Sequence, residues 1–136
     1  MGILGFITIC GLYAKRKYYD PKQRIEKAKN EVKKLIDNNE IREGDLIFQT
    51  SLSGQSRAIQ LATKSKYSHC GIIYKDSGQF FVFEAVQPVK NTKLDKWIAR
   101  GKDGHFVIKR LKNADSILTA ETLQNMRKEG KKFSGK

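Results

Sequence analysis

Apolar residues recur at two spacings along this chain, and the spacings separate predicted helices from predicted strands. Between residues 21 and 37 they lie three or four positions apart, among Lys, Arg and Glu, which is typical of an amphipathic helix. Pro21 suits the first helical position, Asp20 can cap it, and Asn38 and Asn39 end it. The pattern therefore predicts a basic surface helix ahead of the first strand.

Short apolar runs bounded by turn-forming residues predict four strands, at residues 46–49, 67–74, 80–86 and 105–111. Helical spacing predicts three further helices, at residues 55–63, 94–100 and 116–133. We expect Ile59 and Ala62 to face the core, and Asn91-Thr92 to turn the chain. The apolar side of the last helix is expected to hold Ile117, Leu118, Leu123 and Met126. The order of elements predicts an α+β domain with an antiparallel sheet and flanking helices.

Two of these strands each carry one ionisable side chain where a core residue is expected, His69 and Glu84. A four-residue loop from Lys75 to Gly78 would set His69 directly opposite Glu84 on one face of a hairpin. A two-residue loop would offset the pair by two positions but keep it on that face. A shift of one residue would separate the two side chains.

A carboxylate beside an imidazole can fix the histidine tautomer and hold a general base. The alternative is a buried ion pair without chemistry. The strand around Glu84 is apolar on both faces, which predicts a central strand, where an unpaired carboxylate is costly to bury. Because perturbed ionisable pairs gather at functional sites, His69 and Glu84 are the candidate catalytic residues.

The 136 residues suffice for one domain, and their net charge of +13 lies mostly near the ends. Residues 15–34 hold nine Lys or Arg against three Asp or Glu, and residues 127–136 hold five against one. Such ends can contact an anionic membrane surface or nucleic acid, or can be solvated helix faces. No zinc spacing, RNA-binding aromatic motif or repeat accompanies the charge, which disfavours nucleic acid.

Two cysteines, Cys10 and Cys70, exclude a disulfide scaffold. Cys10 lies in an apolar run from Ile3 to Tyr13 that is too short to span a bilayer. The run has the length of a signal-peptide core and Ala14 could end a cleavage site, although Lys15, Arg16 and Lys17 follow the run instead of preceding it. A buried first strand is the alternative. We expect residues 1–14 to be an imperfect or clipped export signal.

No convincing nucleophile accompanies the His–Glu pair. Cys70 follows His69 on the same strand, so its side chain should face away, and we expect it to be buried. Ser53, Ser56, Ser65 and Ser68 lack the sharp strand-to-helix turn of a serine nucleophile. His105 stands alone at a strand start and is interpreted as structural or solvated. No metal-ligand cluster or phosphate-binding glycine loop is visible, so no metal or cofactor is predicted.

Several of these segments together resemble a known family. They are Gly44-Asp45-Leu46-Ile47-Phe48-Gln49, Ser56 to Thr63, Tyr67-Ser68-His69 and Val82-Phe83-Glu84-Ala85-Val86, continued by Pro88-Val89-Lys90 and Trp97-Ile98-Ala99. They are similar to the YiiX-like branch of the NlpC-type papain-fold cysteine hydrolases, over about residues 44–111. This branch is circularly permuted, so its histidine precedes its cysteine. The resemblance implies that His69 is the catalytic histidine, that Glu84 is its polar partner and that the protein is exported.

The chain departs from this pattern at its C-terminal end. The family's nucleophile lies in a Tyr-Cys-Ser-Glu-Leu type segment at a helix start, and no such segment occurs before Lys136. We expect a fragment of a cysteine hydrolase instead of an inactive family member. The expected parts are residues 1–14 as signal or apolar segment, 15–43 as basic helix, and 44–136 as a partial hydrolase domain.

Two other function classes stay open. The first is a non-catalytic module that binds a peptide, glycan stem or lipid in the same groove. The second is a membrane-surface or nucleic-acid binder that uses the basic ends. For the hydrolase, the expected substrate is a peptide, cell-wall or other acyl-bond compound, and the expected location is periplasmic, secreted or membrane-associated.

Overall fold

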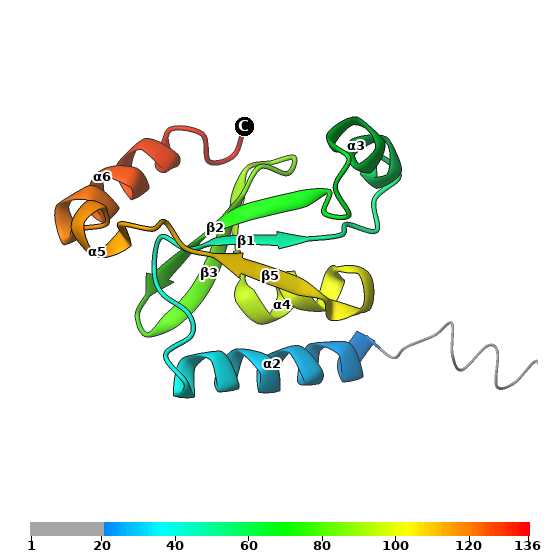
Figure 1. Ribbon diagram of the computed structural model, residues 1–136, viewed down its shortest axis with the longest axis horizontal. Helices are drawn as coiled ribbons and strands as arrows, with labels where there is room; N and C mark the ends of the chain where they lie inside the picture. The colour runs from blue at the N-terminus through cyan, green and yellow to red at the C-terminus, as the bar shows by residue number, and fades with distance from the viewer. Residues whose placement is uncertain (1–20) are drawn as a thin grey trace, which may run out of the picture.

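The structure, a computed structural model, describes residues 21–136 (Figure 1). The proposed export signal and the Asp20 cap lie outside these residues. The helices are α2 (Pro21–Asp37), α3 (Ser56–Thr63), α4 (Leu94–Arg100), the short 3₁₀ turn η1 (Lys102–Gly104), α5 (Ala114–Ile117) and α6 (Ala120–Lys131). The strands are β1 (Leu46–Gln49), β2 (His69–Asp76), β3 (Gln79–Glu84), β4 (Lys90–Lys93) and β5 (Phe106–Lys109).

The five strands form one antiparallel sheet in the order β4-β3-β2-β1-β5. β3 pairs with β2 on one side and β4 on the other, so the prediction that Glu84 lies on a central strand is confirmed. The expected α+β architecture with flanking helices is also confirmed.

The main core lies between one face of the sheet and the helices α4 and α2, with α4 next to the sheet and α2 outside it (Figure 1). Ala28 and Leu35 of α2 are buried against this layer, while Lys29, Lys33 and Lys34 between them are exposed. The prediction of a basic surface helix with an inward apolar stripe is therefore confirmed for the described part. The remaining core residues are Ile41, Ile47, Ile73, Phe80, Val82, Leu94, Trp97, Ile98 and Ala99.

The second face of the sheet is partly covered by α6. The Arg127 guanidinium lies over the Tyr74 ring, and Gly130 allows the helix to approach the Phe83 ring. The expected single helix over residues 116–133 is wrong, because Leu118 and Thr119 interrupt it. Thr119 instead caps α6, since its side chain accepts a hydrogen bond from the Thr122 amide at 3.2 Å.

Two local predictions about the hairpin region are also wrong. The loop between β2 and β3 has two residues, Ser77 and Gly78, whose φ angles of 48° and 79° fit a tight hairpin turn. Asn91 and Thr92 do not turn the chain but belong to the edge strand β4, where they pair with Phe83 and Val82. Both errors arise because pairing partners, not local composition, decided where the strands end.

Helix α3 turns a different side toward the core from the one predicted. Ile59 and Ala62 were predicted to face the core, but both are exposed, and Ser56 is the buried residue of the helix.

None of the helices within residues 21–136 has the length and apolar character needed to cross a membrane.

Candidate active site

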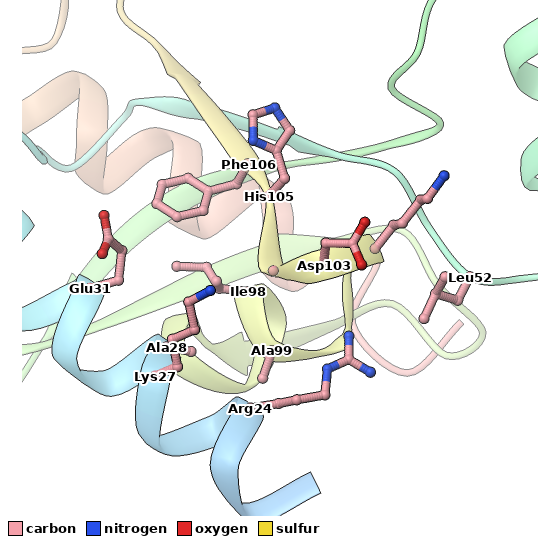
Figure 2. Close-up of a pocket in the computed structure, with 12 residues that line it drawn as sticks. Arg24, Lys27, Ala28, Glu31, Leu52, Ile98, Ala99, Asp103, His105 and Phe106 are labelled. Carbon is pink, nitrogen blue, oxygen red and sulfur yellow. The ribbon is translucent and has the colours of Figure 1, made fainter. Parts of the chain in front are cut away.

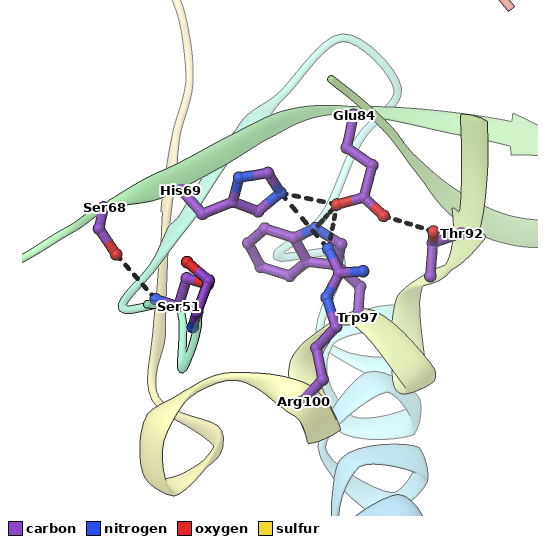
Figure 3. Close-up of polar contacts among 8 residues, drawn as sticks. Ser51, Ser68, His69, Glu84, Thr92, Trp97 and Arg100 are labelled. Atoms are coloured by element: carbon purple, nitrogen blue, oxygen red, sulfur yellow. Dashed lines mark hydrogen bonds and ion pairs between the residues drawn. The ribbon is translucent and has the colours of Figure 1, made fainter. Parts of the chain in front are cut away.

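The β2–β3 hairpin brings His69 and Glu84 together as predicted, by a different register. The two-residue loop pairs Ile72 with Phe83, which offsets the histidine and the glutamate by two positions along the strands. The offset preserves the shared face because side chains alternate with a period of two. His69 Nε2 lies 2.7 Å from Glu84 Oε2, which confirms the predicted contact (Figure 3).

Glu84 is fully buried and holds more than one partner at its carboxylate. Trp97 Nε1 donates to Oε2 at 2.9 Å, the Arg100 guanidinium donates to the same oxygen, and the Thr92 hydroxyl donates to Oε1. Both carboxylate oxygens are therefore occupied by donors from β4 and α4 as well as by the histidine (Figure 3). Such a fixed set of donors holds the carboxylate in one orientation.

These contacts decide the charge of Glu84. Burial by itself raises the pKa of the carboxyl group, but hydrogen bonds from His69, Thr92 and Arg100 and the positive charge of Arg100 outweigh it. The pKa falls from 4.5 to about 2. Glu84 is therefore an anion at neutral pH, and an ionised carboxylate can only accept hydrogen bonds.

This anion determines the tautomer of His69. Because Oε2 can only accept, the neutral imidazole carries its proton on Nε2, and Nδ1 keeps a free lone pair. The imidazole ring stacks on Trp97, with ring centroids 5.9 Å apart, and 18% of the His69 side chain is exposed. Arg100 Nη2 lies 3.4 Å from Nε2, but both atoms are donors, so Arg100 binds the carboxylate and not the imidazole. The arrangement presents Nδ1 as the basic atom.

Sequence reasoning missed three members of this site. Trp97 and Arg100 lie three positions apart on α4, so the correctly predicted helix already placed them on one side. Thr92 was assigned to a turn, and nothing in its neighbourhood indicated that β4 would carry it to Glu84.

Gln49 also lies beside His69, because the two residues pair across β1 and β2. Its side chain is 1% exposed and packs against Gly101, where an added Cβ would come within 2.0 Å of Gln49 Oε1. This oxygen has no hydrogen-bond partner among residues 21–136. A buried acceptor therefore lies one strand away from the imidazole.

A group of hydroxyls borders the other side of His69. Ser68 Oγ lies 2.7 Å from Ser56 Oγ and accepts from the Ser51 amide at 2.9 Å. These bonds tie the start of α3 and the preceding loop to the start of β2, and Figure 3 shows the bond between Ser51 and Ser68. Their role in the described structure is to hold the loop beside the histidine.

Cys70 lies on the opposite face of β2 from His69, as strand alternation requires. The prediction that it is buried is wrong, because its side chain is exposed. Helix α6 contacts that face at Tyr74 and Phe83, further along the hairpin from Cys70. The other isolated candidate, His105, is exposed and stacks on Tyr67 with centroids 6.2 Å apart, in keeping with a structural or solvated role.

A sizeable cavity lies elsewhere, between α2 and η1 (Figure 2). It encloses about 590 Å³ over an apolar floor that includes Ala28 and Ile98, with charged side chains such as Arg24 and Glu31 at its edge. Neither His69 nor Glu84 lines it. Arg24 is committed to a structural bond, since it donates to the Gly101 carbonyl at 2.6 Å. The chemistry of the His–Glu pair is therefore separate from this cavity.

The described residues offer no metal centre, because residues 21–136 contain no group of three or more His, Cys, Asp or Glu side chains placed to share an ion. Both carboxylate oxygens of Glu84 are also occupied, since they accept hydrogen bonds from Thr92, Trp97 and Arg100.

Comparison with known proteins places this geometry in a family. The chain is 45% identical over 93 residues to the uncharacterized protein YiiX of Escherichia coli K12, an alignment that covers 68% of this chain and 45% of YiiX. A crystal structure described as metalloprotein YiiX from Escherichia coli O157:H7 superposes with a TM-score of 0.65 at 45% identity, covering 70% of this chain and 51% of that one. The chain therefore spans about half the length of the relatives it matches. A family model for permuted papain-like amidases, YaeF/YiiX, matches residues 40–136. The family model, the sequence identity and the shared fold agree, and the chain belongs to the C92 family of permuted papain-like amidases.

Proposed function

We propose that this chain supplies the general base and its orienting carboxylate to a cysteine hydrolase that cleaves an amide or related acyl bond. The observation that carries the proposal is the 2.7 Å contact between His69 Nε2 and a Glu84 carboxylate that is buried and ionised. It leaves Nδ1 free to accept a proton. The family match to permuted papain-like amidases supports the same class of reaction.

The nucleophile in this proposal is a thiol from polypeptide beyond the described residues. Cys70 faces away from the imidazole, so it cannot deliver its sulfur to Nδ1. The matched relatives are about twice as long as the aligned region, which leaves room for a segment that carries the thiol. We infer that this segment places its sulfur next to Nδ1.

The proposed reaction has an acylation stage and a deacylation stage. Nδ1 of His69 takes the thiol proton, and the thiolate attacks the carbonyl carbon of the substrate. The tetrahedral intermediate expels the amine or alcohol, which leaves with the proton from Nδ1. Water then gives a proton to Nδ1 and attacks the thioester, which releases the acid and returns the proton to the thiolate. Glu84 stabilises the imidazolium that forms twice in this cycle.

Neither a metal nor a cofactor enters these steps. The related crystal structure is described as a metalloprotein, but the residues described for this chain do not fit a metal site. We propose a peptide, cell-wall compound or other acyl-bond substrate for the complete protein, and export of that protein from the cytoplasm.

The second candidate function is a binding module that uses the same groove without catalysis. The observation that favours it is the absence of a thiol on the His69 face within residues 21–136. A binding module would hold a peptide, glycan stem or lipid against the exposed part of His69, and loss of the imidazole would weaken binding without any effect on turnover.

The deciding experiment compares the 136-residue chain with a version that continues through the reading frame after Lys136. We expect no turnover of amide or ester substrates above background by the shorter chain, because general-base assistance alone contributes roughly 10²–10⁴-fold. The longer chain should hydrolyse such substrates and be captured covalently at its new cysteine by an alkylating inhibitor.

Three variants of the longer chain sharpen this test. His69→Ala should abolish turnover, and Glu84→Gln should reduce it strongly because the tautomer is no longer fixed. His105→Ala is the matched control and should leave turnover unchanged, since that imidazole is exposed and stacks only on Tyr67. Hydrolysis by the 136-residue chain that Cys70→Ser abolishes would contradict the proposal.

A further inference from the structure

Helix α3 presents its apolar side to solvent. Ala58, Ile59, Leu61 and Ala62 form one continuous arc at helical spacing, and all four are exposed. Leu61 is 63% exposed and Ile59 37% exposed, and Leu52 in the loop before the helix is 61% exposed. An apolar helix face is ordinarily packed on the core, so its exposure here indicates a binding surface.

The polar side of the same helix is the side that packs on the domain. Ser56 is buried and bonds to Ser68 at 2.7 Å, and Gln60 Nε2 donates to the Lys66 carbonyl at 2.7 Å. These bonds anchor both turns of α3 through its polar face. The outward direction of the apolar arc is therefore determined by specific hydrogen bonds, and rotation of the helix would break them.

Basic side chains border the apolar arc. Arg57 and Lys64 lie on the Leu61 side of the helix, at positions i−4 and i+3 from that leucine, and both are exposed. Lys66 follows in the next loop and is also exposed. Residues 46–75 contain these three cations and Lys75, and no Asp or Glu. An outward apolar arc whose Leu61 side is bordered by exposed cations is complementary to an anionic lipid surface.

We propose that the α3 face, defined as Arg57, Ile59, Leu61, Lys64 and Lys66, docks on the surface of an anionic lipid bilayer. The apolar side chains enter the boundary between headgroups and acyl chains, and the cations contact lipid phosphates. The alternatives are a partner protein and the polypeptide beyond the described residues, and either would have to supply acidic groups at positions that match these cations. The proposal is independent of the hydrolase function, because it concerns binding and not turnover.

Binding is measured with the full 136-residue chain and vesicles of phosphatidylcholine with and without 30–40% phosphatidylglycerol (roughly the anionic share at which basic segments bind well). We expect co-sedimentation with the anionic vesicles only. Leu61→Glu should weaken binding about tenfold or more, because it places a charge in the apolar arc. Arg57→Gln with Lys64→Gln should weaken it roughly twenty-five-fold, since each cation near such a surface contributes about fivefold.

The matched control removes two charges from another element. Lys29→Gln with Lys33→Gln on α2 changes the net charge equally, and both side chains are exposed. This variant should weaken binding less than about threefold. Residues 1–20 also contain apolar and basic side chains, so a reporter specific to α3 is needed.

Tryptophan fluorescence supplies that reporter, because the native Trp97 is fully buried. The emission of Leu61→Trp should shift to the blue and be quenched by brominated lipid when anionic vesicles are added. Leu111→Trp, at a 45% exposed position outside the α3 face, should show neither effect.

Three outcomes would overturn the proposal. They are the absence of affinity for anionic vesicles, equal binding by the native chain and Leu61→Glu, and no emission shift for Leu61→Trp. If the chain instead forms a dimer that Leu61→Glu dissociates, the face belongs to a second copy and the lipid assignment is wrong.

Discussion

The ionised carboxylate of Glu84 is expected to account for a defined part of the stability of this chain, and Glu84→Gln isolates that part. Gln has the shape of a protonated Glu, so the stability difference between the native chain and the variant reports the carboxylate charge alone. The pKa of Glu84 is lowered from 4.5 to about 2 in the folded chain. This lowering of the pKa on folding corresponds to about 3 kcal/mol of folding free energy when Glu84 is ionised in both the folded and the unfolded chain.

The pH dependence of this stability contribution follows from the direction in which folding shifts the pKa of Glu84. Because the folded pKa lies below the unfolded one, the contribution is fully present above pH 4.5 and is lost as pH falls toward 2. At pH 7 the variant should therefore be less stable by about 3 kcal/mol, and at pH 3 by only about 1 kcal/mol. The loss at pH 7 also agrees with the cost of leaving donors from Trp97 and Arg100 without a charged acceptor.

The assay is urea unfolding at several pH values between 7 and 3, followed by circular dichroism. Glu129→Gln is the control, because that carboxylate is about 60% exposed and pairs only with Lys132 on the helix surface. It should change stability by less than about 0.5 kcal/mol at every pH. A Glu84→Gln variant as stable as the native chain at pH 7, or a difference that stays constant down to pH 3, would refute the reasoning.

Three further results are expected. Gly71→Ala should destabilise the chain by about 3 kcal/mol in urea unfolding, because the new Cβ would lie 2.2 Å from Val82 Cγ1 and 2.8 Å from a backbone oxygen. The control Gly54→Ala should be neutral, since a Cβ at that position meets open space, and equal effects of the two variants would contradict the packing. Asp45→Asn should lower the free energy of unfolding by about 3–5 kcal/mol, because buried Asp45 accepts two 2.7 Å bonds from Arg110 and one from a backbone amide. The control Asp115→Asn, at a 92% exposed position, should change it little. Similar losses of stability in thermal unfolding of the two variants would show that the buried pair is unimportant. Cys70 should react with a thiol reagent in the folded chain about as fast as a peptide cysteine, because it is exposed, and strong protection would show that the face is covered.

Local spacing alone was enough to predict much of the architecture. The periodicity of residues 21–37 identified α2 and its inward stripe, and the predicted helix at residues 94–100 matches α4. The shared face of His69 and Glu84 was also predictable, because side-chain direction in a strand depends only on whether a position is odd or even. An error of two residues in the loop therefore left the candidate site intact.

Burial and long-range pairing were decided only by the tertiary structure. Thr92 reaches Glu84 because β4 pairs with β3, and Arg100 reaches it because α4 packs on the sheet; neither contact has a local signal. The predictions that Cys70 is buried and that Ile59 and Ala62 face the core were wrong for the same reason. Apolar composition indicates which side chains gain from burial, but which of them are covered depends on neighbours from distant segments and on hydrogen bonds such as that between Ser56 and Ser68.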